Sequence, residues 1–181
     1  MDVVRDRSAR EILQATPGVL QALLSGLSDA WLDANEGPNT WSPREVVAHL
    51  ADLEEQDWMV RARIILDQGE SLPFPPVNRE RFRHTLAGNT TAQLLDLFAQ
   101  RRAQNLKTLD QLALKPADLN RKGKHPALGP VTLQQLLATW VVHDFTHLGQ
   151  IVRVMACRYA QTVGPWADYL GILSWRKGEN V

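Results

Sequence analysis

The chain has 181 residues, with 20 Lys and Arg against 20 Asp and Glu, so its formal net charge is zero. This length suits one domain, and 44% hydrophobic with 22% charged residues predicts a folded globular protein. The balanced charge argues against a general attraction to nucleic acid or to an anionic membrane. We therefore expect a single domain over residues 1–181 that binds neither nucleic acid nor membrane.

The chain contains one cysteine, Cys157, which excludes an internal disulfide and a zinc site built on paired thiolates. Any metal site must therefore use His, Asp or Glu. The N-terminal sequence lacks the apolar segment of a signal peptide, and no run reaches the ~18 apolar residues of a membrane span. We expect a cytoplasmic protein.

Four long segments have apolar residues at helical spacing, and none shows sustained strand-type alternation. The first runs from about residue 8 to 27, and Pro17-Gly18 is expected to kink or split it. The second starts at Ser42-Pro43-Arg44-Glu45, which combines an N-cap serine, a proline at the first helical position and a glutamate at the third. This helix is predicted to extend to about Leu66.

The third helix is predicted from Thr90 or Thr91 to about residue 113, and the fourth from Thr132 to Tyr159. Beyond them, the segment from Gly164 to Trp175 is expected to be short and packed. Four amphipathic helices bury their apolar faces most simply as a bundle. The connections over 67–79 and 115–130 are longer than simple up-down bundles use, which favours crossovers. The sequence thus predicts an all-α four-helix bundle with long crossover connections.

Three of the five histidines fall inside predicted helices, on or beside the apolar stripe. His143 and His147 are four residues apart, so their side chains project from one helix face within reach of one metal ion. His49 lies beside the stripe of the second helix and could point at the same spot. Three imidazoles suit Zn²⁺, Ni²⁺, Cu²⁺ or Fe²⁺ and leave a coordination position open. Spacing alone equally allows a buried polar cluster without metal.

The sequence His-Asp-Phe-Thr-His differs from the metalloprotease motif H-E-x-x-H, because Asp144 stands in place of the catalytic glutamate. Aspartate is one methylene shorter and would hold an attacking water differently. The paired Glu-x-x-His units of di-iron bundles are also absent. We expect Asp144 to be a buried hydrogen-bond partner of the site rather than a catalytic base.

Two motifs together carry a family resemblance: W-S-P-R-E-V-V-A-H-L over 41–50 and H-D-F-T-H-L-G-Q-I over 143–151. In this order and about ninety residues apart, they resemble the DinB/YfiT-like family over nearly the whole chain. The resemblance implies a four-helix bundle with a divalent metal, zinc or nickel, held by His49, His143 and His147. It also implies a homodimer, and a thiol-dependent S-transferase or isomerase using bacillithiol or mycothiol as cosubstrate.

Other residues are weaker candidates for contacts with the metal or the substrate. Gln150 shares a helix face with His143 and would either orient a metal-bound water or substrate, or cap a buried network. His125 would either contact the metal or substrate or stay an exposed loop residue. Trp41 and Trp58 are expected to pack in the core or to line a pocket, and Arg101 and Arg102 are expected on a solvated helix face.

Three functions remain open on the sequence. A three-histidine metal with an open position lowers the pKa of bound water or thiol, which suits a hydrolase or an S-transferase acting on a small molecule. Alternatively, the protein is a non-catalytic stress-response or binding module with a structural or sensing metal. A metal-free interaction protein would use the histidines only for hydrogen bonds in its core.

Overall fold

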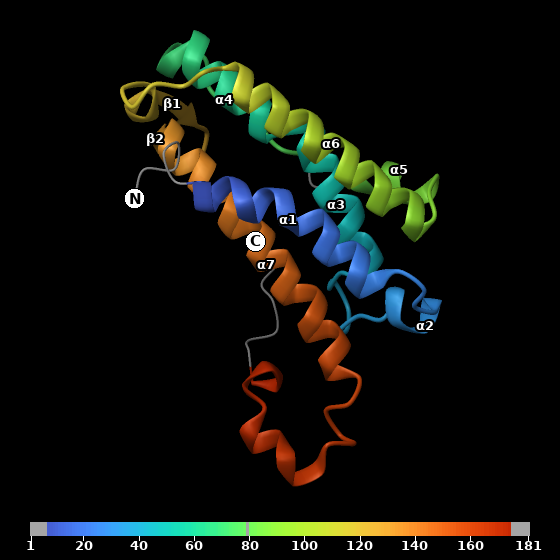
Figure 1. Ribbon diagram of the computed structural model, residues 1–181. Coiled ribbons are helices and arrows are strands. Elements are labelled where there is room, and N and C mark those ends of the chain that lie inside the picture. The colour runs from blue at the N-terminus through green and yellow to red at the C-terminus, as the bar shows by residue number, and fades with distance from the viewer. Residues whose placement is uncertain (1–6, 79, 175–181) are drawn as a thin grey trace.

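The computed structural model describes residues 7–78 and 80–174, which form a bundle of helices (Figure 1). Three long helices begin where the sequence predicts, because each follows a Ser or Thr in a capping box. They are α3 (Pro43–Gln56), α6 (Thr91–Gln111) and α7 (Leu133–Cys157), with caps Ser42, Thr90 and Thr132. In each, the cap side chain accepts a bond from the third helical N–H, and the Glu or Gln at that position accepts one from the cap N–H. These boundaries are therefore fixed locally.

The helix predicted to run to Leu66 is interrupted at Asp57, so this prediction was wrong in part. Asp57 has φ −120° and ψ −80°, and α4 (Trp58–Asp67) follows it. The N–H of Asp57 still bonds the Leu53 carbonyl, and the N–H of Arg61 bonds the Asp57 carbonyl. The chain therefore bends at Asp57 while both backbone groups of this residue keep their helical hydrogen bonds.

Helix α1 (Arg7–Leu24) continues through Pro17, so the predicted split does not occur. A proline inside a helix has no N–H for the carbonyl four residues earlier. Here that carbonyl belongs to Leu13, and it accepts a hydrogen bond of 2.8 Å from Arg102 Nη1 instead. A side chain from α6 thus occupies the acceptor that Pro17 leaves open.

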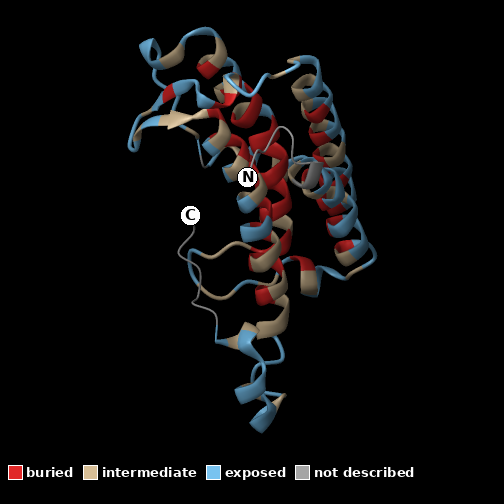
Figure 2. Ribbon diagram, turned by 60° about the vertical axis from the view of Figure 1, so that its left-hand side comes forward, coloured by how far each residue is buried: buried red, intermediate tan, exposed pale blue. Residues whose placement is uncertain are grey.

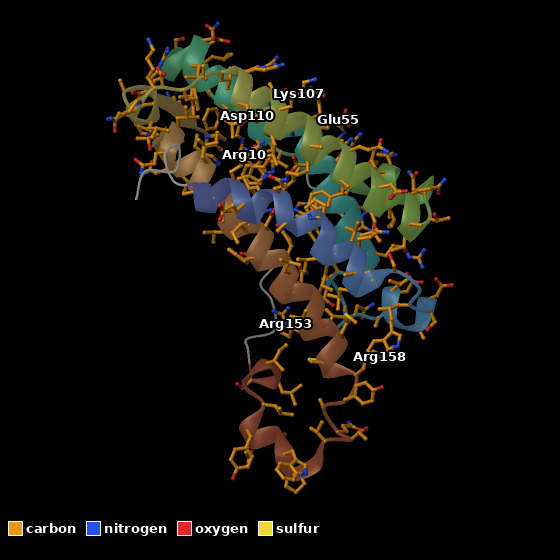
Figure 3. The ribbon with its side chains drawn as sticks, in the orientation of Figure 1. Arg10, Glu55, Lys107, Asp110, Arg153 and Arg158 are labelled. Carbon is orange, nitrogen blue, oxygen red and sulfur yellow. The ribbon has the colours of Figure 1, made fainter. Side chains whose placement is uncertain are left out.

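The four long helical segments are arranged so that α1 and α3 each pack against both α6 and α7. This places α6 and α7 at opposite corners of the bundle (Figure 1). Arg10 of α1 pairs with Asp110 of α6 at 2.8 Å, so the start of one helix meets the end of the other (Figure 3). Because α6 and α7 lie at opposite corners, the chain crosses the bundle between them. The predicted all-α four-helix bundle with crossover connections is confirmed.

Helices α3 and α6 run parallel, because Ala51 is bonded by Arg101 and Glu54 by Asn105, in the same order along both helices. The connection between α4 and α6 must therefore return along the length of the bundle. It contains a 3₁₀ turn (Gly69–Ser71) and the short helix α5 (Phe82–Ala87). The short helix α2 (Asp29–Leu32) lies in the connection between α1 and α3.

The connection over 115–130, predicted to be a loop, instead contains a 3₁₀ turn (Asp118–Asn120) and most of an antiparallel hairpin. Its strands are β1 (Lys122–His125) and β2 (Gly129–Thr132). Gly123 allows this hairpin to pack directly on α4. A Cβ at this position would lie 2.7 Å from carbons of Ile65 and Phe74, which is closer than side chains tolerate. These four-residue strands are too short for an alternation pattern to predict them.

The core has two apolar clusters, and Figure 2 shows the buried residues along the inner faces of the helices. The Trp140 cluster contains Leu13, Leu53, Trp58, Met59, Ala62, Ile65, Phe74, Leu106, Leu119, Leu133, Leu136, Leu137 and Trp140. The Phe98 cluster contains Leu20, Leu24, Leu32, Val46, Val47, Ala48, Leu50, Ala51, Phe82, Leu94, Leu95, Phe98 and Ile151. Along α7, the first cluster ends at Trp140 and the second begins at Ile151, and the polar residues of interest lie between them.

The C-terminal segment consists of two 3₁₀ turns, Gly164–Tyr169 and Gly171–Leu173. The prediction that it is packed was wrong for the first turn, since Trp166 is 71% exposed and Tyr169 is 82% exposed, whereas the second turn contacts α7. Trp175, the last residue of that predicted segment, lies outside the described residues. No helix in the described part of the chain is both long and apolar enough to cross a membrane.

Candidate metal centre

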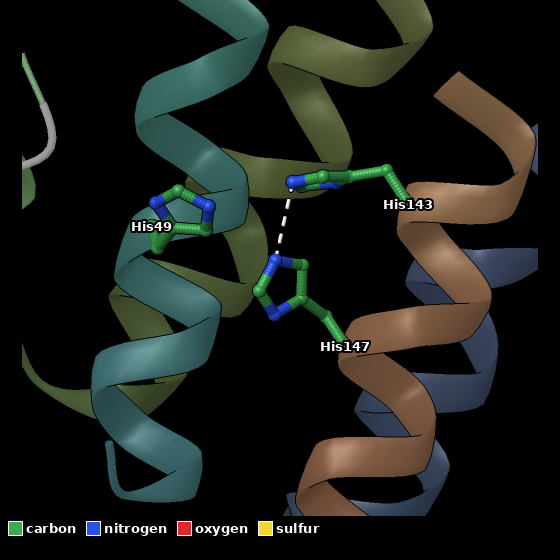
Figure 4. A group of neighbouring side chains, drawn as sticks. All are labelled: His49, His143 and His147. Carbon is green, nitrogen blue, oxygen red and sulfur yellow. Dashed lines mark hydrogen bonds between the residues drawn. The ribbon is translucent and has the colours of Figure 1, made fainter. Parts of the chain in front are cut away.

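Three histidines converge between the two apolar clusters of the core. His49 comes from α3, and His143 and His147 come from successive turns of α7 (Figure 4). Each offers one ring nitrogen, and these three atoms all lie within 4.8 Å of one another. The Nε2 atoms of His143 and His147 are 3.1 Å apart. Ligands of a tetrahedral zinc ion at 2.0–2.1 Å are separated by about 3.3 Å, so this spacing suits a shared ion.

The two α7 histidines are held in the neutral form that a metal requires. Burial lowers the pKa of His143 to about 2, and the neighbouring His147 and His49 rings add to this shift. Burial also lowers the pKa of His147, although its hydrogen bond to Gln150 opposes the change. Neutral imidazoles keep a nitrogen lone pair available for coordination.

Gln150 determines which nitrogen of His147 faces the other histidines. Its Oε1 lies 2.8 Å from His147 Nδ1 and accepts the proton of that nitrogen. The Nε2 atom of His147 is then unprotonated and faces His143. Gln150 thus contacts His147, which lies about one helical turn before it on α7. A hydrogen-bond acceptor behind a metal-binding imidazole is the usual arrangement in metalloproteins.

The remaining ring nitrogen of His143, Nδ1, is not the one that faces His147. His143 Nδ1 is buried, and it has no hydrogen-bond partner among residues 7–78 and 80–174. Buried polar atoms are nearly always paired. The fit to a bound metal ion therefore rests on the three converging ring nitrogens, which lie within 4.8 Å of one another, and not on this second nitrogen of His143.

Two tryptophans flank the histidines. The Trp41 ring lies 4.7 Å from the His49 ring and 6.2 Å from the His147 ring. The Trp58 ring contacts the His143 ring edge-on at 5.2 Å and stacks on Trp140 at 5.7 Å. Both tryptophans therefore restrict the orientation of the histidines as well as packing in the protein.

Asp144 and Arg102 form a buried ion pair beside the histidines. Both carboxylate oxygens of Asp144 accept bonds from Arg102, at 2.6 and 2.8 Å. Arg102 also donates to Glu54, and Glu54 accepts from Trp140 Nε1 at 3.1 Å and from Asn105. Asp144 is thus a buried hydrogen-bond partner, as the sequence analysis expected. Its oxygens are engaged and do not point to a catalytic base.

The expectation that Arg102 lies on a solvated helix face was wrong. Arg102 is 1% exposed, and its guanidinium lies over the rings of Phe98 and Trp140. The sequence carries a signal for this position, since Arg102 follows Phe98 and precedes Leu106 by four residues each, on the buried face of α6. Arg101 is more exposed, and it bonds the Ala51 carbonyl and Glu55.

A cleft of about 410 Å³ opens beside the histidines and reaches His49 and His143. Its walls are mostly apolar and come from α3, α4, α7 and the hairpin. The polar residues in its lining are His49, Asp57, Arg61, His125, Gln135, Thr139 and His143. A second groove of about 430 Å³ follows α7 past His143 and His147. Cavities of this size accept small molecules.

His125 and Trp58 both line this cleft, whereas Trp41 is not part of its lining. His125 lies outside the group of three converging histidines. His125 thus lies in the wall of the cleft, and a contact with substrate stays a prediction for this residue.

The sequence analysis did not select Asp57 and Arg61, although both line the cleft. Arg61 Nε lies 2.5 Å from Asp57 Oδ1. Burial raises the pKa of Asp57 to about 6, against the opposing effect of Arg61, and Glu54 adds to the increase. The spacing of four residues suits a helical ion pair, but nothing in the sequence indicates that the chain bends at Asp57.

The fold and the site together define a four-helix bundle with three histidines that converge between its helices. Comparison with known proteins assigns its family. The family model of the DinB superfamily matches residues 12–151. The chain belongs to the DinB superfamily, as its sequence motifs indicate.

Similar proteins share the fold at low sequence identity. A protein of Oceanobacillus iheyensis, named "Putative metal-dependent hydrolase OB0782", is 22% identical over 142 residues, covering 77% of this chain and 79% of that protein. The structure of YfiT from Bacillus subtilis, described as "a probable metal-dependent hydrolase with an unusual four-helix bundle topology", aligns with a TM-score of 0.73. It is 20% identical, with 91% of this chain and 90% of YfiT covered. TT2238, described as a four-helix bundle protein, has a TM-score of 0.50 and 24% identity, covering 78% and 94%.

Proposed function

We propose that this protein is a metal-dependent hydrolase that binds one divalent ion, zinc or nickel, through His49, His143 and His147. The observation that carries the proposal is the convergence of three ring nitrogens within 4.8 Å beside a cleft that reaches two of them. Three protein ligands with solvent access are typical of a catalytic site, whereas a structural site is closed by four. The names given to the O. iheyensis protein and to YfiT support the same reaction class.

A bound divalent ion would supply a Lewis acid that activates water near neutral pH. The protein's own residues prepare the site for it. Gln150 accepts the Nδ1 proton of His147, which keeps Nε2 free of a proton. Burial keeps His143 neutral by lowering its pKa. Trp58 and Leu53 line the cleft and give it apolar walls beside the histidines.

Metal content and activity of a few variants test this proposal. We expect about one metal ion per chain in tag-free protein by elemental mass spectrometry, and loss of the ion in His49→Ala and in His143→Ala/His147→Ala. His84→Ala is the matched control, because His84 is exposed and outside the site. A protein that takes up neither Zn²⁺ nor Ni²⁺ would contradict the proposal.

The reaction class needs its own measurement on the metal-loaded protein. We expect it to hydrolyse some members of a panel of small esters and amides, and His49→Ala to hydrolyse none. The same panel, extended to electrophiles, is repeated with bacillithiol and mycothiol. A reaction that proceeds only with the thiol would replace the hydrolase proposal by an S-transferase.

A homodimer is part of this proposal, and its support is the outer face of α7. The two charged residues of this helix, Asp144 and Arg153, are both buried. Its exposed residues include Val142, which is 62% exposed, and Phe145, which is 50% exposed. Such an uncharged face suits a second copy of the chain. We expect Val142→Glu/Phe145→Glu to convert a dimer into a monomer in light scattering, and a monomeric wild type would contradict this.

A further inference from the structure

We propose that the end of the cleft at Arg61 and His125 is an anion subsite that binds the carboxylate of an elongated, otherwise apolar substrate. This inference rests on the proposed function, since it names the substrate class of that site. It concerns residues of α4 and the hairpin, outside the three histidines.

Arg61 has hydrogen-bond donors left for a ligand inside the cleft. Its side chain is only 12% exposed, and its Nε pairs with Asp57 Oδ1 at 2.5 Å. Its guanidinium carbon lies 5.3 Å from the centre of the Phe74 ring. Within the described ranges, Arg61 has no other ion-pair partner. The two terminal nitrogens of a guanidinium form the planar fork that binds a carboxylate in two-point contact.

His125 adds a second donor beside the same Phe74 ring. Its Nδ1 accepts bonds from the N–H groups of Ala127 at 3.2 Å and Leu128 at 3.1 Å. A neutral imidazole that accepts at Nδ1 carries its proton on Nε2. The His125 ring meets the Phe74 ring edge-on at 6.2 Å, so both donors flank one aromatic ring. The hairpin turn thereby fixes His125 as a donor at Nε2.

The charges at this end of the cleft favour a monoanion. Arg61 is positive and Asp57 is its counter-ion, while burial and the charge of Arg61 lower the pKa of His125 and keep it neutral. The local sum is close to zero, so a bound carboxylate leaves one net negative charge there, whereas a doubly charged phosphate leaves two. Glu54 also acts on Asp57 and raises its pKa.

The length and walls of the cleft define the rest of the ligand. His49 and Asp57 are eight residues apart along α3, which corresponds to about 12 Å at 1.5 Å per residue. The walls between them include Leu53, Trp58 and Leu136. A substrate that reaches the histidines from Arg61 therefore has a carboxylate at one end, an apolar body along these walls and its reacting group at the other.

Binding to metal-free protein tests the subsite separately from the metal centre. The probes are phenylhexanoate and its neutral amide, added to EDTA-treated full-length protein and followed by tryptophan fluorescence and calorimetry. We expect the carboxylate to bind about tenfold more tightly than the amide, the size of one charged hydrogen bond. Arg61→Gln should abolish this preference, and Asp57→Asn should increase it by removing the counter-ion.

Two further variants keep the test decisive. Arg63→Gln is the matched control, because Arg63 lies on the same helix but is exposed and does not line the cleft. If Arg61→Gln fails to fold, Arg61→Gln/Asp57→Asn removes both charges together and should fold without the preference. Equal binding of the two probes to wild type, or a preference that survives in the double variant, would overturn the subsite. Metal uptake is measured separately, so its failure would affect only the proposed function.

Discussion

Pro17 and Arg102 act on the same backbone atom, the carbonyl oxygen of Leu13. Pro17 has no N–H to donate to it, and Arg102 Nη1 donates at 2.8 Å across the interface between α1 and α6. The same guanidinium holds Asp144, the residue that directly follows His143. A proline in the first helix is therefore linked through one arginine to the helix that carries two of the three histidines.

Replacing Arg102 tests how far this link supports the fold. Arg102→Met should lower the free energy of unfolding by about 3–5 kcal/mol, because it leaves Glu54 and Asp144 as buried, uncompensated carboxylates. Urea denaturation followed by circular dichroism measures the change. Arg101→Met, on the partly exposed neighbour, should change stability by about 1 kcal/mol or less. Equal effects of the two variants would show that the buried ion pairs do not stabilise the protein.

The relationship between Pro17 and Arg102 also predicts a coupling. Pro17→Ala restores an N–H that can bond the Leu13 carbonyl, and this gain matters most when Arg102 is absent. We expect Pro17→Ala to be more stabilising in the Arg102→Met background than in wild type, by about 1–3 kcal/mol. A double-mutant cycle from urea denaturation gives this number. Strict additivity would mean that the two residues do not share the carbonyl.

Gln150 should control metal affinity through the tautomer of His147. Gln150→Leu removes the acceptor at Nδ1 and should weaken the binding of Zn²⁺ by about 10- to 100-fold. Gln150→Glu keeps an acceptor and should bind at least as tightly as wild type. Competition with a chromogenic chelator measures both constants. Unchanged affinity in Gln150→Leu would remove Gln150 from the site, and Gln100→Leu controls for the loss of an amide elsewhere.

The buried carboxyl of Asp57 makes stability depend on pH. Its pKa is about 6 in the folded protein against 3.8 for the free group, so the folded state binds a proton more tightly than the unfolded state. Stability from this group is therefore greatest at low pH and falls as pH rises from about 4 to 6. The shift corresponds to about 3 kcal/mol.

Asp57→Asn lacks this titration, so the variant should gain stability relative to wild type by up to about 3 kcal/mol between pH 4 and pH 7. Urea denaturation of both proteins at several pH values measures the difference. The pH dependence that comes from the other carboxylates is the same in both and cancels. Asp110→Asn, which removes an exposed carboxylate, is the control. A constant difference between wild type and Asp57→Asn would mean that the Asp57 pKa is not raised.

The features that could be predicted from sequence are those fixed within a few residues. The three capping boxes depend on side chains three positions apart, and the His143–His147 pair depends on one helical turn. The burial of Arg102 was not predicted, because an arginine is expected at the surface. Its place on the apolar face between Phe98 and Leu106 was the better guide. Its partners come from α1, α3 and α7, so no local pattern shows that its charge is compensated.

The cleft could not be predicted for the same reason. Asp57, Arg61 and His125 meet there because the chain bends between α3 and α4 and because the hairpin packs on α4. Both features depend on contacts between segments far apart in the sequence. The family motifs located the histidines, but they do not include the residues at the other end of the cleft.

Gly123 affects the size of the cleft, although it lies in the hairpin and not on the helices that carry the histidines. The hairpin that contributes His125, Pro126, Leu128 and Val131 to the cleft approaches α4 only because position 123 lacks a side chain. A methyl group there would lie 2.7 Å from carbons of Ile65 and Phe74, so this wall of the cleft would have to shift. The space available to a substrate thus depends on a residue in a strand that lies outside the helices carrying the histidines.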